Sequence, residues 1–357
     1  MKKIILTGGG TAGHVTPHLA LLPALRKAEF EIQYIGSHNG IERGLAEKAG
    51  LTYHPIASGK LRRYLDVKNI TDMFRVVKGL SDALRVLRRV KPALVFSKGG
   101  FVAVPVVMAA RLLRIPTIIH ESDFTSGLAN RLAAPFAKKI CVAFPETLKN
   151  ISTKKAILTG IPIREELLKG SPTAGLKMCG FENNGKPILL VTGGSQGAAA
   201  INNAVREALP ALTKKFRIIH LCGKGNLLNP LPNGNAPNTY AQFEYISDGL
   251  ANLYAAADIV LSRAGAGTIF ELLAMKKPHL LVPLSKNASR GDQILNAQSF
   301  QKQGYSAVLQ EEDMNPATLT AEIDALYCRK NDYIKSMAQA QQTDGIAAVM
   351  DALLLHV

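Results

Sequence analysis

Two glycine-rich turns, about one domain length apart, are the segments of this sequence best suited to bind phosphate. Residues 8–13 (Gly-Gly-Gly-Thr-Ala-Gly) follow one short aliphatic run, and residues 193–197 (Gly-Gly-Ser-Gln-Gly) follow another. Each turn leads into an alanine- and leucine-rich stretch with helical periodicity. Glycine lets the backbone approach a phosphate closely, and the start of a helix offers unpaired N–H groups. Both turns are therefore candidate anion sites, although a tight connection that binds nothing is the alternative for the first.

The first turn is followed by a histidine and departs from the pattern of dinucleotide-binding proteins. That pattern, G-x-G-x-x-G, is accompanied by an acidic residue at the end of the second strand, whereas the strand expected at 31–36 ends in Gly36. We therefore expect no dinucleotide and no other cofactor. His14 is either a helix-capping residue or, in a mouth lined by backbone N–H groups, a group that binds an oxyanion or moves a proton.

The segment 262–271 (Ser-Arg-Ala-Gly-Ala-Gly-Thr-Ile-Phe-Glu) predicts a site for a nucleoside diphosphate. Small residues after a strand bring the backbone close to a phosphate at a helix start, and Glu271 can accept hydrogen bonds from a ribose diol. The alternative is an ordinary helix start in which Thr268 and Glu271 form a capping box. The chain has no Asp-x-Asp pair, so we expect no metal. Helix dipoles, backbone donors and Arg164 would then stabilise a leaving diphosphate.

Polar residues also follow two further predicted strands, 93–97 and 117–120. The sequences there are Ser-Lys-Gly-Gly-Phe at 97–101 and His-Glu-Ser-Asp at 120–123. Parallel sheets present functional groups at the carboxyl ends of their strands, and two carboxylates beside a histidine favour proton transfer. A polar loop with capped helices is the other interpretation of either segment.

All these segments lie between predicted strands and helices that alternate along the chain. Such alternation is typical of a parallel sheet covered on both faces. The chain turns polar and proline-rich near 159–164 and stays irregular up to Lys186-Pro187, which marks a linker. We therefore predict two α/β domains with doubly wound, Rossmann-like parallel sheets, at 1–160 and 161–342. After the first strand, the others are expected at 31–36, 93–97, 117–120, 140–142, 188–192, 217–222, 240–244, 259–262, 279–282 and 307–309.

The composition describes a chain that can bury two ordinary cores. It has 357 residues, 47% of them hydrophobic, and no apolar run reaches the ~18 residues that span a bilayer. No signal-peptide pattern precedes the first strand, so we expect a cytoplasmic protein. The cysteines stand far apart without a CxxC pair, and reduced thiols are expected at Cys141, Cys179, Cys222 and Cys328.

Positive charge is concentrated in the first half of the chain. Residues 1–160 contain 25 Lys and Arg against 10 Asp and Glu, whereas residues 161–357 contain 18 against 17. This asymmetry points to nucleic acid or an anionic membrane surface. Segment 68–91 predicts a basic amphipathic helix, which either packs on the core with a solvated rim or lies on a membrane. The residues expected at a membrane are Met73, Phe74, Val77, Arg75 and Lys78.

Taken in order, the motifs resemble those of glycosyltransferase family 28, which contains glycosyltransferases of peptidoglycan synthesis and plant and bacterial diacylglycerol sugar transferases. The likeness runs nearly end to end. It rests on residues 8–14, 99–101, 120–121, 160–164, 193–197 and 263–268, on Glu271, and on Asp292-Gln293 with Asn296-Ala297. The resemblance implies a GT-B fold, in which two domains face each other across a cleft and the final segment, 343–357, packs back on the first domain.

The resemblance also implies substrates and residue roles. The second domain would hold the donor UDP-N-acetylglucosamine, and the acceptor would be undecaprenyl-pyrophosphoryl-N-acetylmuramyl-pentapeptide on the cytoplasmic face of the cell membrane. The implied donor contacts are Ala266, Gly267 and Thr268 with the diphosphate, Glu271 with the ribose, Ile246 with the uracil, Asp292 and Gln293 with the sugar, and Thr11, Ala12, Gly13, Asp123, Arg164, Ser195 and Gln196. Gly99 and Gly100 would belong to the acceptor side. Ser122-Asp123 stand where the family often has Gln-Asn, and Phe101 stands where many relatives have tyrosine.

The activity so implied is an inverting sugar transfer. The acceptor 4-hydroxyl attacks the anomeric carbon, a general base takes its proton, and UDP leaves at helix N-termini. His14 and Glu121 are both candidates for the base. Rival functions are a sugar-nucleotide epimerase of the same two-domain shape, a diacylglycerol glycosyltransferase, and a nucleic-acid binder, although no nucleic-acid motif interleaves aromatic with basic residues here.

Overall fold

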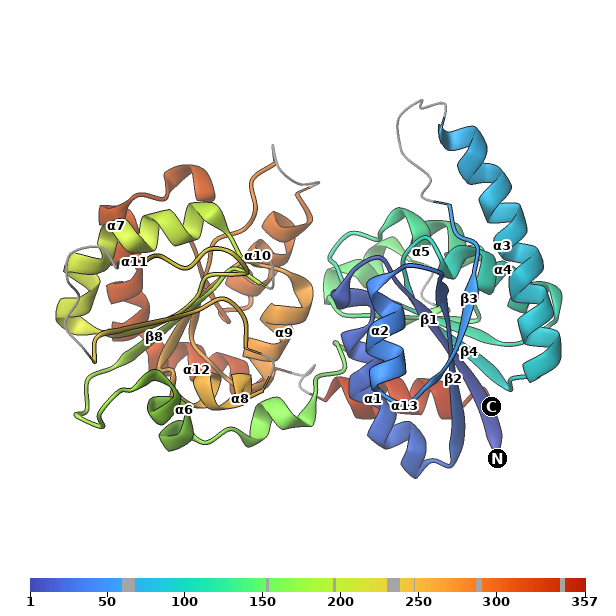
Figure 1. The fold of residues 1–357 in the computed structure, drawn as a ribbon, viewed down its shortest axis with the longest axis horizontal. Helices are drawn as coiled ribbons and strands as arrows, with labels where there is room; N and C mark the ends of the chain where they lie inside the picture. The colour runs from blue at the N-terminus through green and yellow to red at the C-terminus, as the bar shows by residue number, and fades with distance from the viewer. Residues whose placement is uncertain are drawn as a thin grey trace. The chain divides into compact units, whose positions relative to one another are not determined.

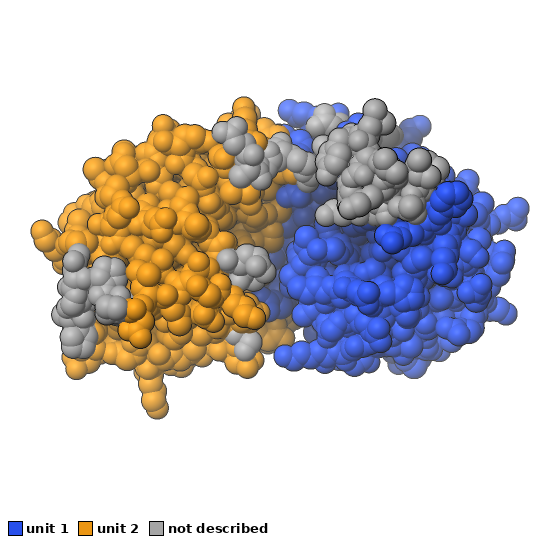
Figure 2. Space-filling view, turned by 45° about the horizontal axis from the view of Figure 1, so that its top comes forward, with its two compact units in different colours: residues 1–164, 344–357 blue, residues 165–343 orange. Residues whose placement is uncertain are grey.

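The structure is a computed structural model, and it describes residues 1–357 except 60–67, 152–153, 195–196, 230–237, 247, 287–290 and 341–343. The chain forms two compact units, coloured separately in Figure 2. Unit 1 comprises Met1–Arg164 and Asp344–Val357, and unit 2 comprises Glu165–Thr343. Each unit contains its own parallel sheet with helices around it (Figure 1), which confirms the predicted fold class.

Over the described residues, the sheet of unit 1 has seven parallel strands in the order β3-β2-β1-β4-β5-β6-β7. The strands are β1 (Lys2–Gly8), β2 (Phe30–Ser37), β3 (Thr52–Ile56), β4 (Leu94–Gly99), β5 (Thr117–Glu121), β6 (Lys139–Val142) and β7 (Ala156–Leu158). The helices are α1 (Thr16–Lys27), α2 (Ile41–Lys48), α3 (Lys68–Val90), α4 (Ala103–Leu112), α5 (Leu128–Ala133) and α13 (Gly345–Leu354).

The sheet of unit 2 has six parallel strands within the described ranges, in the order β10-β9-β8-β11-β12-β13. They are β8 (Ile188–Thr192), β9 (Arg217–Leu221), β10 (Tyr240–Phe243), β11 (Ile259–Ser262), β12 (His279–Leu281) and β13 (Ala307–Val308). The helices are α6 (Pro172–Cys179), α7 (Ala199–Lys215), α8 (Leu250–Ala256), α9 (Ala266–Ala274), α10 (Asp292–Lys302), α11 (Pro316–Cys328) and α12 (Lys330–Ala338).

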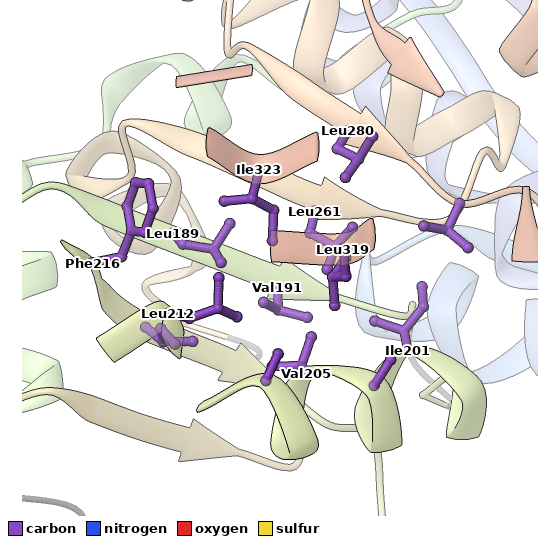
Figure 3. Close-up of a cluster of buried hydrophobic side chains, with 14 of the residues drawn as sticks. Leu189, Val191, Ile201, Val205, Leu212, Phe216, Leu261, Leu280, Leu319 and Ile323 are labelled. Carbon is purple, nitrogen blue, oxygen red and sulfur yellow. The ribbon is translucent and has the colours of Figure 1, made fainter. Parts of the chain in front are cut away.

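Alternate strand residues point to opposite faces of each sheet, and both faces are covered. In unit 1, Ile4 and Leu6 pack in one apolar cluster with α1 and α13, while Ile5 packs in another with α3 and α4. In unit 2, Figure 3 shows side chains of α7, such as Val205, directed toward Val191 on β8, with Leu319 of α11 in the same cluster. Burial on both faces explains why the central strands are continuous aliphatic runs.

In both sheets the order of the strands reverses beside the first strand, between β1 and β4 in unit 1 and between β8 and β11 in unit 2. Loops at such a switch point diverge to opposite faces of the sheet, leaving room for a ligand at the carboxyl ends of the strands. The glycine turns and the 97–101 and 262–271 segments follow these four strands. Sheet order therefore brings the segments singled out by the sequence together in pairs, one pair per unit.

The last helix of the chain belongs to the core of unit 1. Val349, Met350 and Leu353 of α13 are buried in the same cluster as Leu21 and Leu25 of α1. The start of α13 is equally close-packed, because a Cβ on Gly345 would lie 2.3 Å from the carbonyl O of Ile161. Residues far apart in sequence thus complete one apolar layer.

The prediction missed β3, β7 and α6. Strands β3 and β7 are the two edges of the unit 1 sheet and are only partly buried. An edge strand needs no continuous aliphatic run and tolerates proline, here Pro55, so the usual signal is absent. Helix α6 lies in the stretch predicted as linker, where Ser171 accepts a hydrogen bond from the N–H of Ala174 as N-cap and Gly180 ends the helix with φ 66°.

The basic amphipathic segment predicted at 68–91 is helix α3. It runs along α4 (Figure 1), and its residues Ala83, Leu87 and Val90 are buried against that helix. Among the helices described, none combines the length and apolarity needed to cross a bilayer.

Candidate functional site

A buried carboxylate outside the motif holds the glycine turn after β1. Glu42 on α2 is fully buried, and its Oε2 accepts from the backbone N–H of Gly10 at 3.2 Å. Its Oε1 accepts from the N–H and the hydroxyl of Ser37 at 3.0 and 2.5 Å. A Cβ on Gly9 would lie 2.5 Å from this carboxylate. The protein itself therefore uses one N–H of the turn, and the sequence offered no signal because Glu42 is 32 residues from Gly10.

His14 follows the turn in the 3-10 helix η1 (Ala12–His14), where a hydrogen bond fixes its tautomer. Its Nδ1 lies 2.7 Å from the carbonyl O of Gly9. Because a carbonyl only accepts, Nδ1 carries a proton, and Nε2 of the neutral ring holds the lone pair. Burial lowers the pKa of His14, the hydrogen bond to Gly9 opposes this shift, and the charge of Lys98 lowers the pKa further against the charges of Asp123 and Glu42. The ring is therefore a neutral base at pH 7.

The turn after β4 touches the turn after β1. Gly99 and Gly100 have φ of 88° and 84°, which only glycine adopts without strain. A Cβ on Gly100 would lie 2.3 Å from the carbonyl O of Gly9, and one on Gly99 would lie 2.7 Å from Oδ1 of Asn130. Gly100 is thus required by the close approach of two backbones, and Gly99 by its positive φ and the side chain of Asn130.

Glu121, the last residue of β5, is buried and accepts three hydrogen bonds. Its Oε1 accepts from the N–H of Asp123 at 3.1 Å, and its Oε2 accepts from the N–H of Gly127 at 2.9 Å and from Nδ2 of Asn130 at 3.0 Å. Burial raises the pKa of Glu121, while the bond from Asn130 acts in the opposite direction. These bonds shape the loop between β5 and α5 around the carboxylate.

Lys98, at the end of β4, is a buried lysine that was not predicted as a site residue. Its side chain lies beside His120, and Nζ is 2.7 Å from Nδ1 of that ring; it also donates to the hydroxyl of Ser122. His120 Nε2 lies 2.8 Å from the carbonyl O of Gly160, so Nε2 carries the proton and Nδ1 accepts from the amine. Burial lowers the pKa of Lys98 to about 8, opposed by the charges of Glu121 and Asp123.

The remaining predicted residues of unit 1 lie in the loops at the carboxyl ends of its strands or at the end of its first segment. Thr11 and Gly13 are exposed, whereas Ala12, Asp123 and Arg164 are half-buried. Asp123 lies close enough to His14 for its charge to raise the pKa of that ring. Arg164 is the last residue of the first segment of unit 1.

In unit 2, the glycine turn after β8 bends toward α7. Gly194 and Gly197 have φ of 83° and 76°, and a Cβ on Gly197 would lie 2.1 Å from the carbonyl O of Cys222. Helix α7 then begins behind Ala198, whose methyl group cannot cap it. Two predicted donor residues of this turn, Ser195 and Gln196, lie outside the described residues.

Helix α9 begins directly after β11 with an N-terminus that no capping box closes. Its N-cap is Gly265, which has no side chain to accept from the first turn. Thr268 is the third residue of the helix, so it does not form with Glu271 the capping box considered as an alternative. Gly267 is exposed, Thr268 and Glu271 are half-buried, and their spacing places all three on one helix face. A diphosphate bound at the start of α9 and a ribose bound at Glu271 require the free helix N-terminus and the carboxylate to lie on one face of the helix.

Side chains behind this turn hold it in place. Nη1 of Arg263 donates to the carbonyls of Val282 and Pro283 at 3.2 and 3.3 Å, and its Nη2 pairs with Glu311. Asn296 on α10 is fully buried and donates from Nδ2 to the carbonyl O of Ala264 at 3.2 Å. The arginine of the motif therefore joins the turn to the neighbouring strand end.

The other predicted donor residues lie on the carboxyl side of the same sheet. Ile246 is half-buried in the loop after β10, and Asp292 and Gln293 form the first turn of α10. Oε1 of Gln293 accepts from the N–H of Leu284 at 3.1 Å, which ties α10 to the loop after β12. In the part of the chain that is described, no three His, Cys, Asp or Glu side chains are grouped so that they could hold a metal ion.

Helix α3 carries two exposed apolar side chains among exposed cations. Phe74 is 73% exposed and Val77 is 62% exposed, and Arg75 and Lys78 beside them are exposed as well. The helix therefore packs on the core through its later turns and presents a basic, apolar surface through its earlier ones. The side chain of Met73, predicted with this group, is outside the described part.

Comparison with known proteins identifies the class. The model of the glycosyltransferase family 28 N-terminal domain matches residues 4–142, and that of the glycosyltransferase family 28 C-terminal domain matches residues 188–353. The chain belongs to glycosyltransferase family 28 and is a glycosyltransferase, as the motifs predicted.

Particular relatives are similar over their full length. The chain is 56% identical over 351 residues to the UDP-N-acetylglucosamine--N-acetylmuramyl-(pentapeptide) pyrophosphoryl-undecaprenol N-acetylglucosamine transferase of Clostridium novyi (strain NT), covering 98% of each chain. It is 56% identical over 353 residues to the protein of the same name from Clostridium botulinum (strain Langeland / NCTC 10281 / Type F), covering 99% of each. The solved structure of Acinetobacter baumannii MurG is 26% identical and matches with a TM-score of 0.77, covering 99% of this chain and 100% of that one.

Replacing Glu42 by glutamine should loosen the glycine turn after β1. One accepting oxygen becomes an NH₂ group that faces a donor, so we expect unfolding to cost about 1–3 kcal/mol less. Hydrogen exchange at the amide of Gly10 should accelerate. The control is Glu47→Gln on the same helix, because Glu47 makes only an exposed ion pair with Arg43, and its effect should stay within about 0.5 kcal/mol. Equal effects of both changes would contradict the role given to Glu42.

Proposed function

We propose that the chain transfers N-acetylglucosamine from UDP-N-acetylglucosamine to the 4-hydroxyl of undecaprenyl-pyrophosphoryl-N-acetylmuramyl-pentapeptide, with inversion at the anomeric carbon. The groups found at the two switch points carry the proposal. The switch point of unit 2 presents an open helix N-terminus with a carboxylate one turn along, and that of unit 1 presents a neutral histidine of fixed tautomer. The names of the relatives at 56% identity, which describe this transfer, support it.

The donor would bind to unit 2. Its diphosphate would accept from the first N–H groups of α9 around Ala266, Gly267 and Thr268, where the helix dipole favours negative charge. The ribose diol would donate to Glu271, the uracil would lie at Ile246, and the sugar hydroxyls would meet Asp292 and Gln293. Because the first turn of α9 has no side-chain cap, its N–H groups remain suited to stabilise the charge that develops on UDP as the anomeric bond breaks.

His14 is the base favoured by the geometry. Its Nε2 holds a lone pair, and its lowered pKa keeps it neutral at pH 7, so it can take the proton of the attacking hydroxyl. Both oxygens of Glu121 already accept hydrogen bonds from its own loop and Asn130. We therefore propose that Glu121 maintains the shape of the loop that carries Asp123, and that His14 takes the proton of the attacking hydroxyl.

The reaction is tested by asking what UDP release requires. Purified protein is incubated with UDP-N-acetylglucosamine alone, with polyprenyl-pyrophosphoryl-N-acetylmuramyl-pentapeptide, or with diacylglycerol, and UDP is measured. We expect UDP to form only with the muramyl acceptor. Transfer to diacylglycerol, or conversion of the donor to an epimer without any acceptor, would replace the proposal by one of its rivals.

Glu271→Ala should weaken donor binding specifically. A hydrogen bond to a charged group contributes about 1.5–3 kcal/mol, so the Kd for UDP should rise roughly 10- to 150-fold. Isothermal titration with UDP measures it, and Glu312→Ala, which removes an exposed carboxylate of unit 2, is the control. A Kd within about twofold of wild type, a change of only ~0.4 kcal/mol, would remove Glu271 from the ribose site.

The pH profile should identify His14 as the base. Protonation of Nε2 removes the base, so kcat/KM should fall as pH drops, with a midpoint below 6.5 because the pKa of His14 is lowered. His14→Ala should reduce kcat by about 10²–10⁴-fold and abolish this acid limb. Glu121→Gln should retain the limb. Loss of the limb in Glu121→Gln but not in His14→Ala would reverse the assignment.

We also propose that the protein is peripheral to the cytoplasmic face of the cell membrane, and that α3 of unit 1 binds its anionic surface. Phe74 and Val77 would enter the headgroup boundary while Arg75 and Lys78 meet anionic lipid. The positive charge concentrated in residues 1–160 favours the same orientation toward anionic lipid.

Reversing the charge of Arg75 and Lys78 should release the protein from anionic vesicles. Each basic contact contributes about 1 kcal/mol near such a surface, so the double change to glutamate should lower partitioning at least about 30-fold, and added salt should weaken wild-type binding. Turnover on a short-chain soluble acceptor should change little. The control, Lys214→Glu with Lys302→Glu, makes the same change of net charge on exposed residues of unit 2. Equal release by both pairs would show a nonspecific effect of net charge.

A further inference from the structure

Lys98 is the least expected charge in unit 1. It is only 1% exposed, at the carboxyl end of β4, and it shares a sheet face with Phe96, which belongs to the apolar cluster of α1 and α13. Its two hydrogen-bond partners, His120 and Ser122, are uncharged. Burying an ammonium group among neutral partners disfavours folding. A methionine of similar length would fill the same space, so packing alone does not explain a lysine here.

The contacts of the amine connect two segments that carry site residues. On one side, Nζ donates to the hydroxyl of Ser122, which directly precedes Asp123. On the other side, it donates to Nδ1 of His120, whose Nε2 donates to the carbonyl O of Gly160. Gly160 begins the stretch with which the first segment of unit 1 ends, at Arg164. One amine therefore holds both segments, and the hydrogen bonds of a charged donor are about twice as strong as neutral ones.

We propose that Lys98 is a positioning residue for the transfer: its charged amine fixes the Ser122–Asp123 turn directly and the Gly160–Arg164 segment through the ring of His120. The proposal rests on the proposed function, since its main readout is sugar transfer. Lys98 acts through these neighbours, because at 1% exposure its amine is covered by them. It sets where Asp123 lies beside His14, and a displacement of about 1 Å there is enough to cost roughly 100-fold in rate.

Titratable groups on several elements surround the amine, and its charge lowers the pKa values of the histidines among them. A change in that charge should therefore alter the pH profile. These groups are His14 and His18 from the glycine turn and α1, His120, Glu121 and Asp123 from β5 and its loop, and Cys141 from β6. The pKa of Lys98 is lowered to about 8, so the amine is charged below that pH and neutral above it. Its charge also lowers the pKa of His14, and removing it should raise that pKa.

The test compares Lys98→Met with wild type in transfer, pH profile and thermal stability. We expect kcat/KM of Lys98→Met to fall about 100-fold and its acid limb to move to higher pH. Wild-type kcat/KM should decline above about pH 8, where the amine loses its charge, and Lys98→Met should lack this decline. The melting temperature should stay equal or rise, because a methionine removes the cost of burying a charge. The control is Lys277→Met. Lys277 precedes β12, and its amine donates to the carbonyls of Ala255 and Ala257. Its replacement should leave all kinetic readouts unchanged.

Ser122→Ala keeps the proposal testable if Lys98→Met fails to fold. It removes one contact of the amine, so kcat/KM should fall by about 10-fold while the protein stays folded, and with Lys98→Met the two losses should not add, because coupled residues share one effect. Wild-type activity in a folded Lys98→Met would overturn the inference, and so would wild-type activity in Ser122→Ala if Lys98→Met does not fold. So would a rate loss in Lys98→Met that only follows a lowered melting temperature, with the pH profile unmoved. Absence of transfer by the wild-type protein would instead overturn the proposed function.

Discussion

The backbones of the turns after β1 and β4 touch at Gly9 and Gly100, and the site of unit 1 depends on that contact. A single methyl group at Gly100 would lie 2.3 Å from the carbonyl O of Gly9. The same carbonyl accepts from Nδ1 of His14 and so leaves the lone pair of the neutral ring on Nε2. The carbonyl of Gly9 thus limits residue 100 to glycine and also fixes the tautomer of His14. Glu42 completes the arrangement by holding Gly10 from the other side.

A layer of polar side chains lies above the apolar cluster of unit 1, at the carboxyl ends of its strands. Tyr34 donates to the carbonyl O of Gly8 at 2.8 Å, and its hydroxyl lies 3.3 Å from Nδ1 of His18. Lys98 and His120 continue the layer across β4 and β5. Burial raises the pKa of Tyr34 and lowers that of His18, and the charges of neighbouring residues act in the same directions. Burial also lowers the pKa of His120, so among these four side chains Lys98 is the charged one.

The two units share a strand order but use their switch points differently. Unit 1 places side chains at the carboxyl ends of its strands: an imidazole after β1, a lysine at the end of β4, and carboxylates at the end of β5 and in the loop that follows it. Unit 2 presents backbone, because Gly265 opens α9 without a side-chain cap while Arg263 and Asn296 brace the turn from behind. Backbone N–H groups suit a diphosphate, whose charge is spread over several oxygens, and a single basic nitrogen suits one hydroxyl proton. This division supports the proposal that unit 2 binds the donor and unit 1 activates the acceptor.

The sequence alone determined the class of fold and the family, and it singled out most segments of the candidate site. Central parallel strands are buried on both faces and appear as aliphatic runs, and glycine is required wherever backbones touch, so both leave local signals. Edge strands β3 and β7 gave no aliphatic run that could be recognised in the sequence, because they are only partly buried. Whether Thr268 caps a helix depended on where α9 begins. The roles of Glu42 and Lys98, and the tautomer of His14, were decided only by tertiary structure. Each depends on a hydrogen-bond partner supplied by the folded backbone or by a distant strand or helix, and residue order does not show which partner that is.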